Sequence, residues 1–156
     1  MPNKWTFTID PIERLLARYT HYGLWIDPFA GQHSPATIRN DLNPKANAEY
    51  HMDALDFLKM QARESVDGVL FDPPYSPSQM KECYENIGTP LTGDKTNMLF
   101  WSDCKKQIEL ILRPGGYVIS FGWNSMGIGM KKGYELVEIL LVPHGGGKND
   151  TICTVQ

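Results

Sequence analysis

Short apolar runs alternate with segments of helical spacing along this chain, and the alternation limits the folds that it can adopt. The apolar runs lie at residues 24–26, 37–38, 66–71, 117–121, 136–142 and 151–155, and the helical segments at residues 11–19, 54–62, 78–86 and 99–112. Strands that alternate with helices form a mostly parallel sheet with helices on both faces. We therefore expect an α/β fold.

The last two apolar runs depart from the alternation. Residues 143–150, with the sequence PHGGGKND, connect them and contain no helical segment. Two strands joined in this way form a β-hairpin, so we expect the last strand to run antiparallel to its neighbour. In the last helical segment, the helical spacing places Cys104, Ile108, Ile111 and Leu112 on one side.

Length and composition indicate one globular domain. The chain has 156 residues, of which 42% are hydrophobic and 21% charged, and it contains no apolar run of about 18 residues that could span a membrane. The N-terminal segment is not of signal-peptide type, so we expect a cytoplasmic protein. Cys83, Cys104 and Cys153 are widely spaced and odd in number, which argues against disulfides and against a structural metal.

The net charge of −3 is unfavourable for a protein that binds nucleic acid, because Lys and Arg supply affinity by neutralising phosphates. Any contact with nucleic acid is therefore expected to be local, weak or assisted. Basic side chains in the second half could line one face, or could simply be solvated: Lys105, Lys106, Arg113, Lys131, Lys132 and Lys148.

Acidic residues follow three of the predicted strands or open the next helix. Ligands of open α/β sheets bind at the carboxyl ends of the strands, where this chain has Asp27-Pro28-Phe29-Ala30-Gly31 and Asn40-Asp41-Leu42-Asn43-Pro44. The first segment suits a tight turn close to a ligand, and Asp41 could hold a ribose diol or cap a turn. In Met52-Asp53-Ala54-Leu55, Asp53 could accept a hydrogen bond from a ligand or serve as a helix N-cap.

The segment Asp72-Pro73-Pro74-Tyr75 follows the buried run at residues 66–71. Two prolines restrict the backbone on both sides of each ring, so this turn is rigid. A rigid turn can direct the Asp72 carboxylate and the Pro73 carbonyl at one point, where they suit an amino group with two hydrogens. The ring of Tyr75 offers a stacking surface beside them.

In this order, the motifs resemble the amino-methyltransferases of DNA, which methylate adenine N6 or cytosine N4, and especially the small adenine methylases of bacteriophage type. The resemblance covers nearly the whole chain, from Phe7-Thr8-Ile9-Asp10-Pro11 through DPFAG, NDLNP, MDAL and DPPY to LRPGGYVISFG at residues 112–122. It implies a Rossmann-like, S-adenosylmethionine-dependent methyltransferase fold over residues 1–156. It also implies transfer of a methyl group from S-adenosylmethionine to adenine N6 in DNA, in a prokaryotic or phage-infected cell.

The resemblance further implies roles for individual residues. Asp41 would hold the ribose of the cofactor, Leu42 would pack on its adenine, and Asp53 would accept from its amine. The full set of expected cofactor contacts is Thr8, Ile9, Asp10, Asp27, Pro28, Phe29, Ala30, Gly31, Asp41, Leu42, Asp53, Ala54 and Asp72. The catalytic group would be Asp72, Pro73, Pro74 and Tyr75, acting on a base flipped out of the duplex.

Two features depart from the family pattern. The first motif continues as Gln32-His33-Ser34-Pro35 where the family has small residues, so the turn is expected to be tighter or the next helix almost absent. The motifs occupy the sequence up to Gln156, so we expect no separate target-recognition domain. A homodimer or a partner protein would then supply affinity for DNA.

Several alternatives stay open. A D/N-P-P-Y/F tetrapeptide also occurs in enzymes that methylate adenine N6 or guanine N2 in RNA, and the chain could be an inactive scaffold or partner subunit. A nicotinamide-binding domain is disfavoured because no GxGxxG follows the first strand. Among the histidines, His144 is the best candidate to touch substrate, ahead of His33 and His51. Residues 87–98 form either a mobile loop over the site or a plain surface connection.

Overall fold

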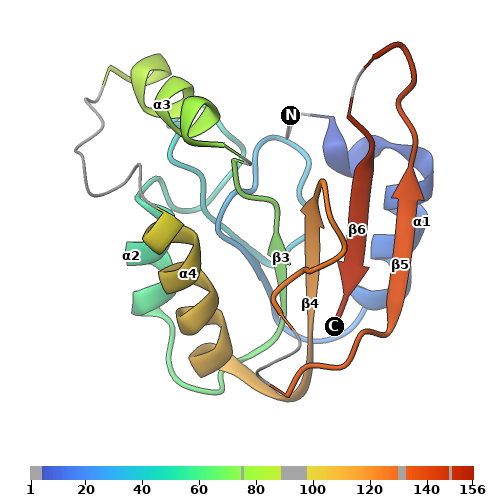
Figure 1. Cartoon of the computed structure of the whole chain (residues 1–156). Helices are drawn as coiled ribbons and strands as arrows, with labels where there is room; N and C mark the ends of the chain where they lie inside the picture. The colour runs from blue at the N-terminus through green and yellow to red at the C-terminus, as the bar shows by residue number, and fades with distance from the viewer. Residues whose placement is uncertain (1–4, 75, 89–97, 130–132, 148) are drawn as a thin grey trace.

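The computed structural model describes residues 5–74, 76–88, 98–129, 133–147 and 149–156. Its elements are the 3-10 turn η1 (Thr6–Thr8), the helices α1 (Asp10–Tyr19), α2 (Ala54–Met60), α3 (Pro77–Asn86) and α4 (Met98–Ile111), and the strands β1 (Trp25–Asp27), β2 (Ile38–Arg39), β3 (Val66–Phe71), β4 (Leu112–Gly122), β5 (Glu138–Val142) and β6 (Thr151–Val155). The strands form one sheet in the order β2-β1-β3-β4-β6-β5, of which β3, β4, β6 and β5 can be followed in Figure 1.

The pairing of the strands confirms the predicted α/β class. Strands β2, β1, β3 and β4 are parallel, whereas β6 is antiparallel to both β4 and β5. The expected C-terminal hairpin is therefore present, and its last strand lies between β4 and β5. All the helices and strands expected from the sequence are found.

Strand β4 begins earlier than the apolar run at residues 117–121 predicts. Val66 of β3 pairs with Leu112, but Gly68 pairs with Tyr117, so β4 has an irregularity between these pairs. The extra residues include Gly115, which has a φ of +79° that favours glycine. The residues between these two pairs thus form a bulge within the strand.

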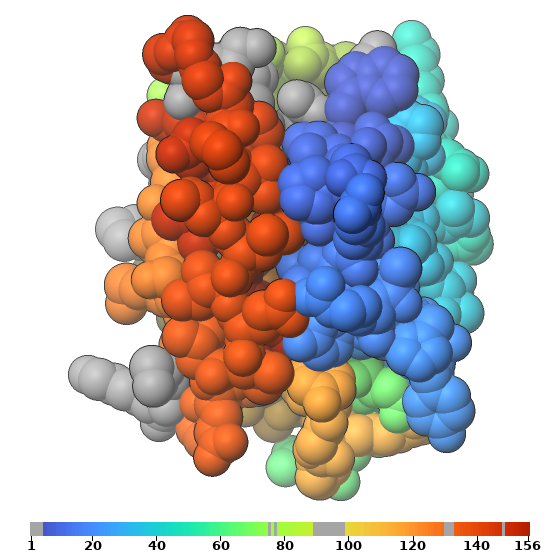
Figure 2. Space-filling view, turned by 90° about the vertical axis from the view of Figure 1, so that its right-hand side faces the viewer, coloured from blue at the N-terminus to red at the C-terminus, as the bar shows by residue number. Residues whose placement is uncertain are grey.

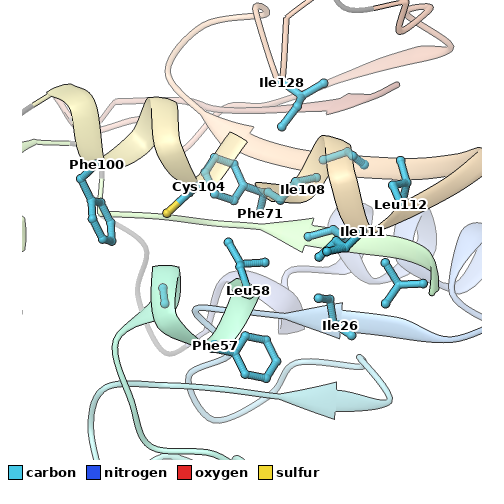
Figure 3. Close-up of a cluster of buried hydrophobic side chains, with 14 of the residues drawn as sticks. Ile26, Phe57, Leu58, Phe71, Phe100, Cys104, Ile108, Ile111, Leu112 and Ile128 are labelled. Carbon is cyan, nitrogen blue, oxygen red and sulfur yellow. The ribbon is translucent and has the colours of Figure 1, made fainter. Parts of the chain in front are cut away.

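Helices α2 and α4 cover one face of the sheet. Side chains of a strand alternate between the two faces, and Ile26, Val69 and Val118 point to this one. Figure 3 shows the cluster, with Phe57 and Leu58 from α2 and Cys104, Ile108 and Ile111 from α4 gathered against the strands. Cys104, Ile108, Ile111 and Leu112, which the helical spacing places on one side, all belong to this cluster.

Helix α1 covers the opposite face beside the C-terminal hairpin (Figure 2). Its buried residues Ile12, Leu15 and Leu16 have the spacing of a single helix face and pack in the cluster that includes Trp25 and Leu70. At the end of α1, the hydroxyl of Tyr19 donates to Glu138 of β5 at 2.9 Å. Helices therefore lie on both faces, as predicted.

No helix is present between β1 and β2, whose connecting residues 28–37 are all described. This confirms the expectation that the helix after the first motif is almost absent. The chain instead turns sharply after Asp27 and returns to pair β2 in parallel with β1. Among the described residues, no helix is long and apolar enough to cross a membrane.

Candidate active site

A cavity of about 340 Å³ lies at the carboxyl ends of β1, β2 and β3. From β1 the chain first adds β2 on one side and then β3 on the other side. The direction in which strands are added therefore reverses at β1, next to this cavity. Ligands of open α/β sheets bind at such a point. The cavity is lined by Phe7, Pro28, Phe29, Ala30, Gly31, Gln32, Asp41, Leu42, Asn43, Ala46, Asp53, Ala54, Asp72, Pro74, Met80, Cys83, Tyr84, Asn86, Ile87 and Phe100.

Asp27 ends β1 and is completely buried. Its carboxylate accepts from the Phe29 backbone N–H at 2.8 Å and from the Ser34 hydroxyl at 2.6 Å. Burial penalises the charged form and raises the pKa of Asp27 to about 8, although both hydrogen bonds oppose the rise. Asp27 does not line the cavity, so its visible role is to shape the turn that does.

Asn40, directly after β2, ties three of the predicted motifs together. Its side-chain nitrogen donates to the carbonyls of Pro28 and Met52, each at 3.0 Å, and its side-chain oxygen accepts from the Met52 N–H at 3.1 Å. Its backbone N–H donates to the Asp27 carbonyl at 2.8 Å, and its carbonyl accepts from Ala30 at 2.9 Å. Asn40 is fully buried, and sequence reasoning did not single it out.

Asp41 lines the cavity next to Asn40, and two backbone N–H groups hold its carboxylate. One carboxylate oxygen accepts from Gly31 and the other from Asn43, each at 2.8 Å. The turn at Gly31 has a φ of +58°, which glycine adopts without strain. A carboxylate can accept about four hydrogen bonds, so these two contacts leave Asp41 able to accept from a ligand.

Asp53 has both roles that its position in the sequence suggests. It is the N-cap of α2, with Oδ1 accepting from the Leu55 N–H at 3.0 Å and the Asp56 N–H at 3.4 Å. It also lines the cavity, where Oδ2 accepts from the hydroxyl of Tyr84 at 2.6 Å. Tyr84 belongs to α3, so this bond joins two helices across the cavity wall.

Asp72 and Pro74 reach the cavity from the end of β3. Asp72 is only 3% exposed, and its charge contributes to the raised pKa of Asp27. The indole Nε1–H of Trp101 in α4 donates to the Pro74 carbonyl at 3.1 Å, which ties the diproline turn to the helical layer. Pro73 is buried but does not line the cavity, and Tyr75 lies outside the described residues.

The expected N-terminal contacts are not part of the cavity lining. Thr8, Ile9 and Asp10 are not among its lining residues, whereas their neighbour Phe7 is. The Thr8 hydroxyl donates to the Trp5 carbonyl at 3.0 Å, and Asp10 pairs with Arg14 at 3.1 Å. A contact from these three residues to a cofactor stays a prediction.

Helix α3 forms a wall of the cavity that the sequence motifs did not identify. It contributes Met80, Cys83, Tyr84 and Asn86, followed by Ile87. The spacing of residues 78–86 predicts a helix, but nothing in it shows which surface the helix covers. Ser76 caps α3 by accepting from the Gln79 N–H at 3.2 Å, and this fixes where the helix begins after the diproline turn.

The three candidate histidines lie outside the cavity lining. His144 contacts the Thr151 hydroxyl at 2.8 Å within its own hairpin, His33 stacks on Trp5, and His51 contacts the Asp41 carbonyl at 3.3 Å. Most of the loop proposed at residues 87–98 lies outside the described part of the chain.

Three of the basic side chains considered for nucleic-acid binding interact within the protein. Lys105 donates to the Gly127 carbonyl at 2.6 Å, while Lys106 pairs with Asp103 at 2.8 Å and Arg113 with Asp67 at 2.7 Å. The remaining three, Lys131, Lys132 and Lys148, lie outside the described residues. A basic face for nucleic acid therefore stays a prediction.

Comparison with known proteins identifies the fold. No family model and no curated protein sequence matches the chain. Among solved structures, SMU.776, a protein assigned as a methyltransferase and solved in complex with SAH, matches over 97% of this chain and 50% of its own, with a TM-score of 0.61 and 11% identity. The protein yhhF from Escherichia coli, also assigned as a methyltransferase, matches over 94% and 82%, with a TM-score of 0.50 and 12% identity. The chain has a methyltransferase fold.

TrmN from Thermus thermophilus has the same arrangement over 93% of this chain and 48% of its own, with a TM-score of 0.57 and 17% identity. At 11 to 17% identity the likeness concerns the fold. Within this methyltransferase fold, the cavity occupies the carboxyl end of the parallel strands.

Proposed function

We propose that this protein transfers a methyl group from S-adenosylmethionine to the N6 amine of adenine in DNA. The observation that carries the proposal is the position of Asp72. This buried carboxylate follows β3 and lines the same cavity as Asp41 and Asp53. Asp72 and Pro74 of the proposed catalytic turn therefore border the same cavity as Asp41 and Asp53, although these residues lie far apart in the sequence.

The lining of the cavity fits the proposed cofactor. Apolar groups such as Ala30, Leu42 and Met80 can cover an aromatic ring, and Asp41 offers acceptors for hydroxyl groups. The carboxylates of Asp41, Asp53 and Asp72 create a negative potential in a partly desolvated space. Such a potential favours a ligand that carries a sulfonium and an ammonium group.

In this proposal the protein positions the substrate amine. When bound, S-adenosylmethionine supplies a methyl group on a sulfonium, which is a good leaving group. Asp72 and the carbonyl of Pro73, which lies between the cavity-lining Asp72 and Pro74, would accept hydrogen bonds from the two hydrogens of the adenine amine, which frees the nitrogen lone pair from the ring. The Asp72 carboxylate would then take the one proton that the amine releases on methylation. Orientation and electrostatics in a site shielded from water then lower the barrier. Trp101 supports this geometry by holding the Pro74 carbonyl.

The choice of DNA as the substrate rests on the family resemblance. An adenine amine inside a duplex cannot reach a buried carboxylate, so the base is flipped out, and stacking on Tyr75 offsets part of the cost. Because the net charge is −3, a second copy of the chain or a partner protein supplies affinity for the DNA backbone in this proposal.

The substrate class can be tested with S-adenosylmethionine labelled on the methyl group. Duplex DNA, single-stranded DNA and RNA are each incubated with the protein, and the labelled nucleoside is identified. Label in N6-methyladenine of DNA is the expected result. Label only in adenine or guanine of RNA supports the RNA alternative, and failure to bind S-adenosylmethionine in calorimetry supports an inactive scaffold.

The role of Asp72 can be tested by Asp72→Ala. We expect methyl transfer to fall by at least about 100-fold, while binding of S-adenosylmethionine stays measurable because Asp41 and Asp53 remain. Asp103→Ala is a matched control, since Asp103 pairs with Lys106 on an exposed part of α4, and it should keep full activity. Full activity of Asp72→Ala would contradict the proposed mechanism.

A further inference from the structure

The hydroxyl of Tyr84 is placed to control the orientation of Asp53. Tyr84 is 5% exposed and belongs to the same apolar cluster as Phe57, Met80 and Cys104. Its hydroxyl donates to Asp53 Oδ2 at 2.6 Å. Burial and the bond to Asp53 raise the pKa of Tyr84, so the phenol keeps its proton and remains a donor near neutral pH.

The other oxygen of Asp53 is held from the opposite side. Oδ1 accepts from the first backbone N–H groups of α2, at Leu55 and Asp56. Donors on both oxygens fix the plane of the carboxylate, because rotation of the group would break at least one of these bonds. A carboxylate oxygen can accept two hydrogen bonds, so the bond from Tyr84 does not by itself use up the acceptor capacity of Oδ2.

We propose that Tyr84 is a positioning residue that selects a 6-aminopurine in the cofactor site by holding Asp53 in one orientation. The inference rests on the proposed function, which assigns Asp53 to the adenine amine of S-adenosylmethionine. A fixed carboxylate accepts from an amine and repels the carbonyl oxygen of a 6-oxopurine. A carboxylate that can rotate discriminates less, because it can turn away from the carbonyl.

The bond also connects the two halves of the site. Asp53 is the N-cap of α2 on the cofactor side, and α3 follows shortly after the diproline turn on the substrate side. Both Tyr84 and Asp53 line the cavity. In this proposal, α3 reaches across the cavity and sets the geometry of a cofactor contact from the substrate side.

The test compares two ligands by calorimetry: S-adenosylhomocysteine and S-inosylhomocysteine, which has a 6-oxo group in place of the amine. We expect the unmodified protein to prefer the adenosine form by about tenfold or more, since a site built around a hydrogen-bonded amine rejects a ligand that lacks it. In Tyr84→Phe, which retains the ring, we expect this preference to fall by about fivefold. If Tyr84 only supported the structure, its loss would weaken the binding of both ligands equally and leave the ratio of their affinities unchanged.

Tyr19→Phe is the matched control. The hydroxyl of Tyr19 also donates to a carboxylate, since it bonds to Glu138 at 2.9 Å. This bond lies on the opposite face of the sheet, which α1 covers. The preference of Tyr19→Phe for S-adenosylhomocysteine over S-inosylhomocysteine should equal that of the unmodified protein. Should Tyr84→Phe fail to fold, Asp53→Ser preserves an N-cap for α2 and should lose the preference.

Each other outcome overturns the inference. An unchanged preference in folded Tyr84→Phe or in Asp53→Ser would overturn it. Tighter binding of S-adenosylhomocysteine to Tyr84→Phe would also overturn it, because Tyr84 would then compete with the cofactor for Asp53. An unmodified protein that binds both ligands equally refutes the inference and leaves the proposed function standing. One that binds neither refutes both.

Discussion

At the scale of single residues, Asp27 connects the architecture of the site to pH. Its folded-state pKa is raised from 3.8 to about 8, so the unfolded chain releases the proton first as pH rises. Folding therefore loses stability progressively between about pH 4 and pH 8, at up to about 1.4 kcal/mol per pH unit. Below this window both states are protonated, and above it both are ionised.

Asp27→Asn should remove this pH dependence. Urea unfolding at pH 5 and pH 8 is expected to show a smaller loss of stability for the variant than for the unmodified protein, because asparagine does not titrate. Asp103→Asn, an exposed control, should retain the full loss. Identical losses in the protein and Asp27→Asn would show that Asp27 does not titrate in this range.

The bond from Trp101 to the Pro74 carbonyl can be tested at the same scale. Trp101→Phe keeps an aromatic ring but removes the Nε1–H donor, so the diproline turn loses one restraint. We expect single-turnover methyl transfer to slow by about three- to tenfold with cofactor affinity unchanged. Trp5→Phe, which alters an exposed indole stacked on His33, should have no effect. A parallel loss of cofactor affinity would indicate collapse of the cavity instead.

At the scale of elements, β3 depends on one glycine. A Cβ on Gly68 would lie 2.4 Å from the indole of Trp25 in β1, which is too close for any side chain. We expect Gly68→Ala to lower the free energy of unfolding by about 1 to 3 kcal/mol, measured by urea denaturation. Gly122→Ala at the end of β4 is the control, since its nearest neighbours would be 3.9 Å away. Equal stability of the two variants would contradict this packing.

The elements also show where periodicity is informative. The spacing of Ile12, Leu15 and Leu16 predicts which side of α1 is buried, because the helical period is local. The close approach of Gly68 to Trp25 is not local, and a glycine within an apolar run does not reveal which ring occupies its space. For the same reason, the helical spacing of α3 could not predict that this helix lines the cavity.

At the scale of the whole molecule, the last strand of the chain lies inside the sheet and not at its edge. Strand β6 pairs with β4 on one side and β5 on the other, so removing it would separate β5 from the sheet. We expect a chain that ends at residue 150 to lose its cooperative thermal unfolding transition, as followed by circular dichroism. Cys153 and Val155, both fully buried, account for much of this loss. A cooperative transition in the shortened chain would contradict the expectation.

The sequence by itself determined the α/β class, the hairpin and the grouping of acids at strand ends, because each depends on local periodicity or on turn residues. Tertiary structure decided which of these acids share a cavity and what holds them. The clamp made by Asn40, the bond from Tyr84 to Asp53 and the tie from Trp101 to the diproline turn join residues from different elements. Such contacts depend on how helices and strands pack, and local residue patterns do not encode that packing.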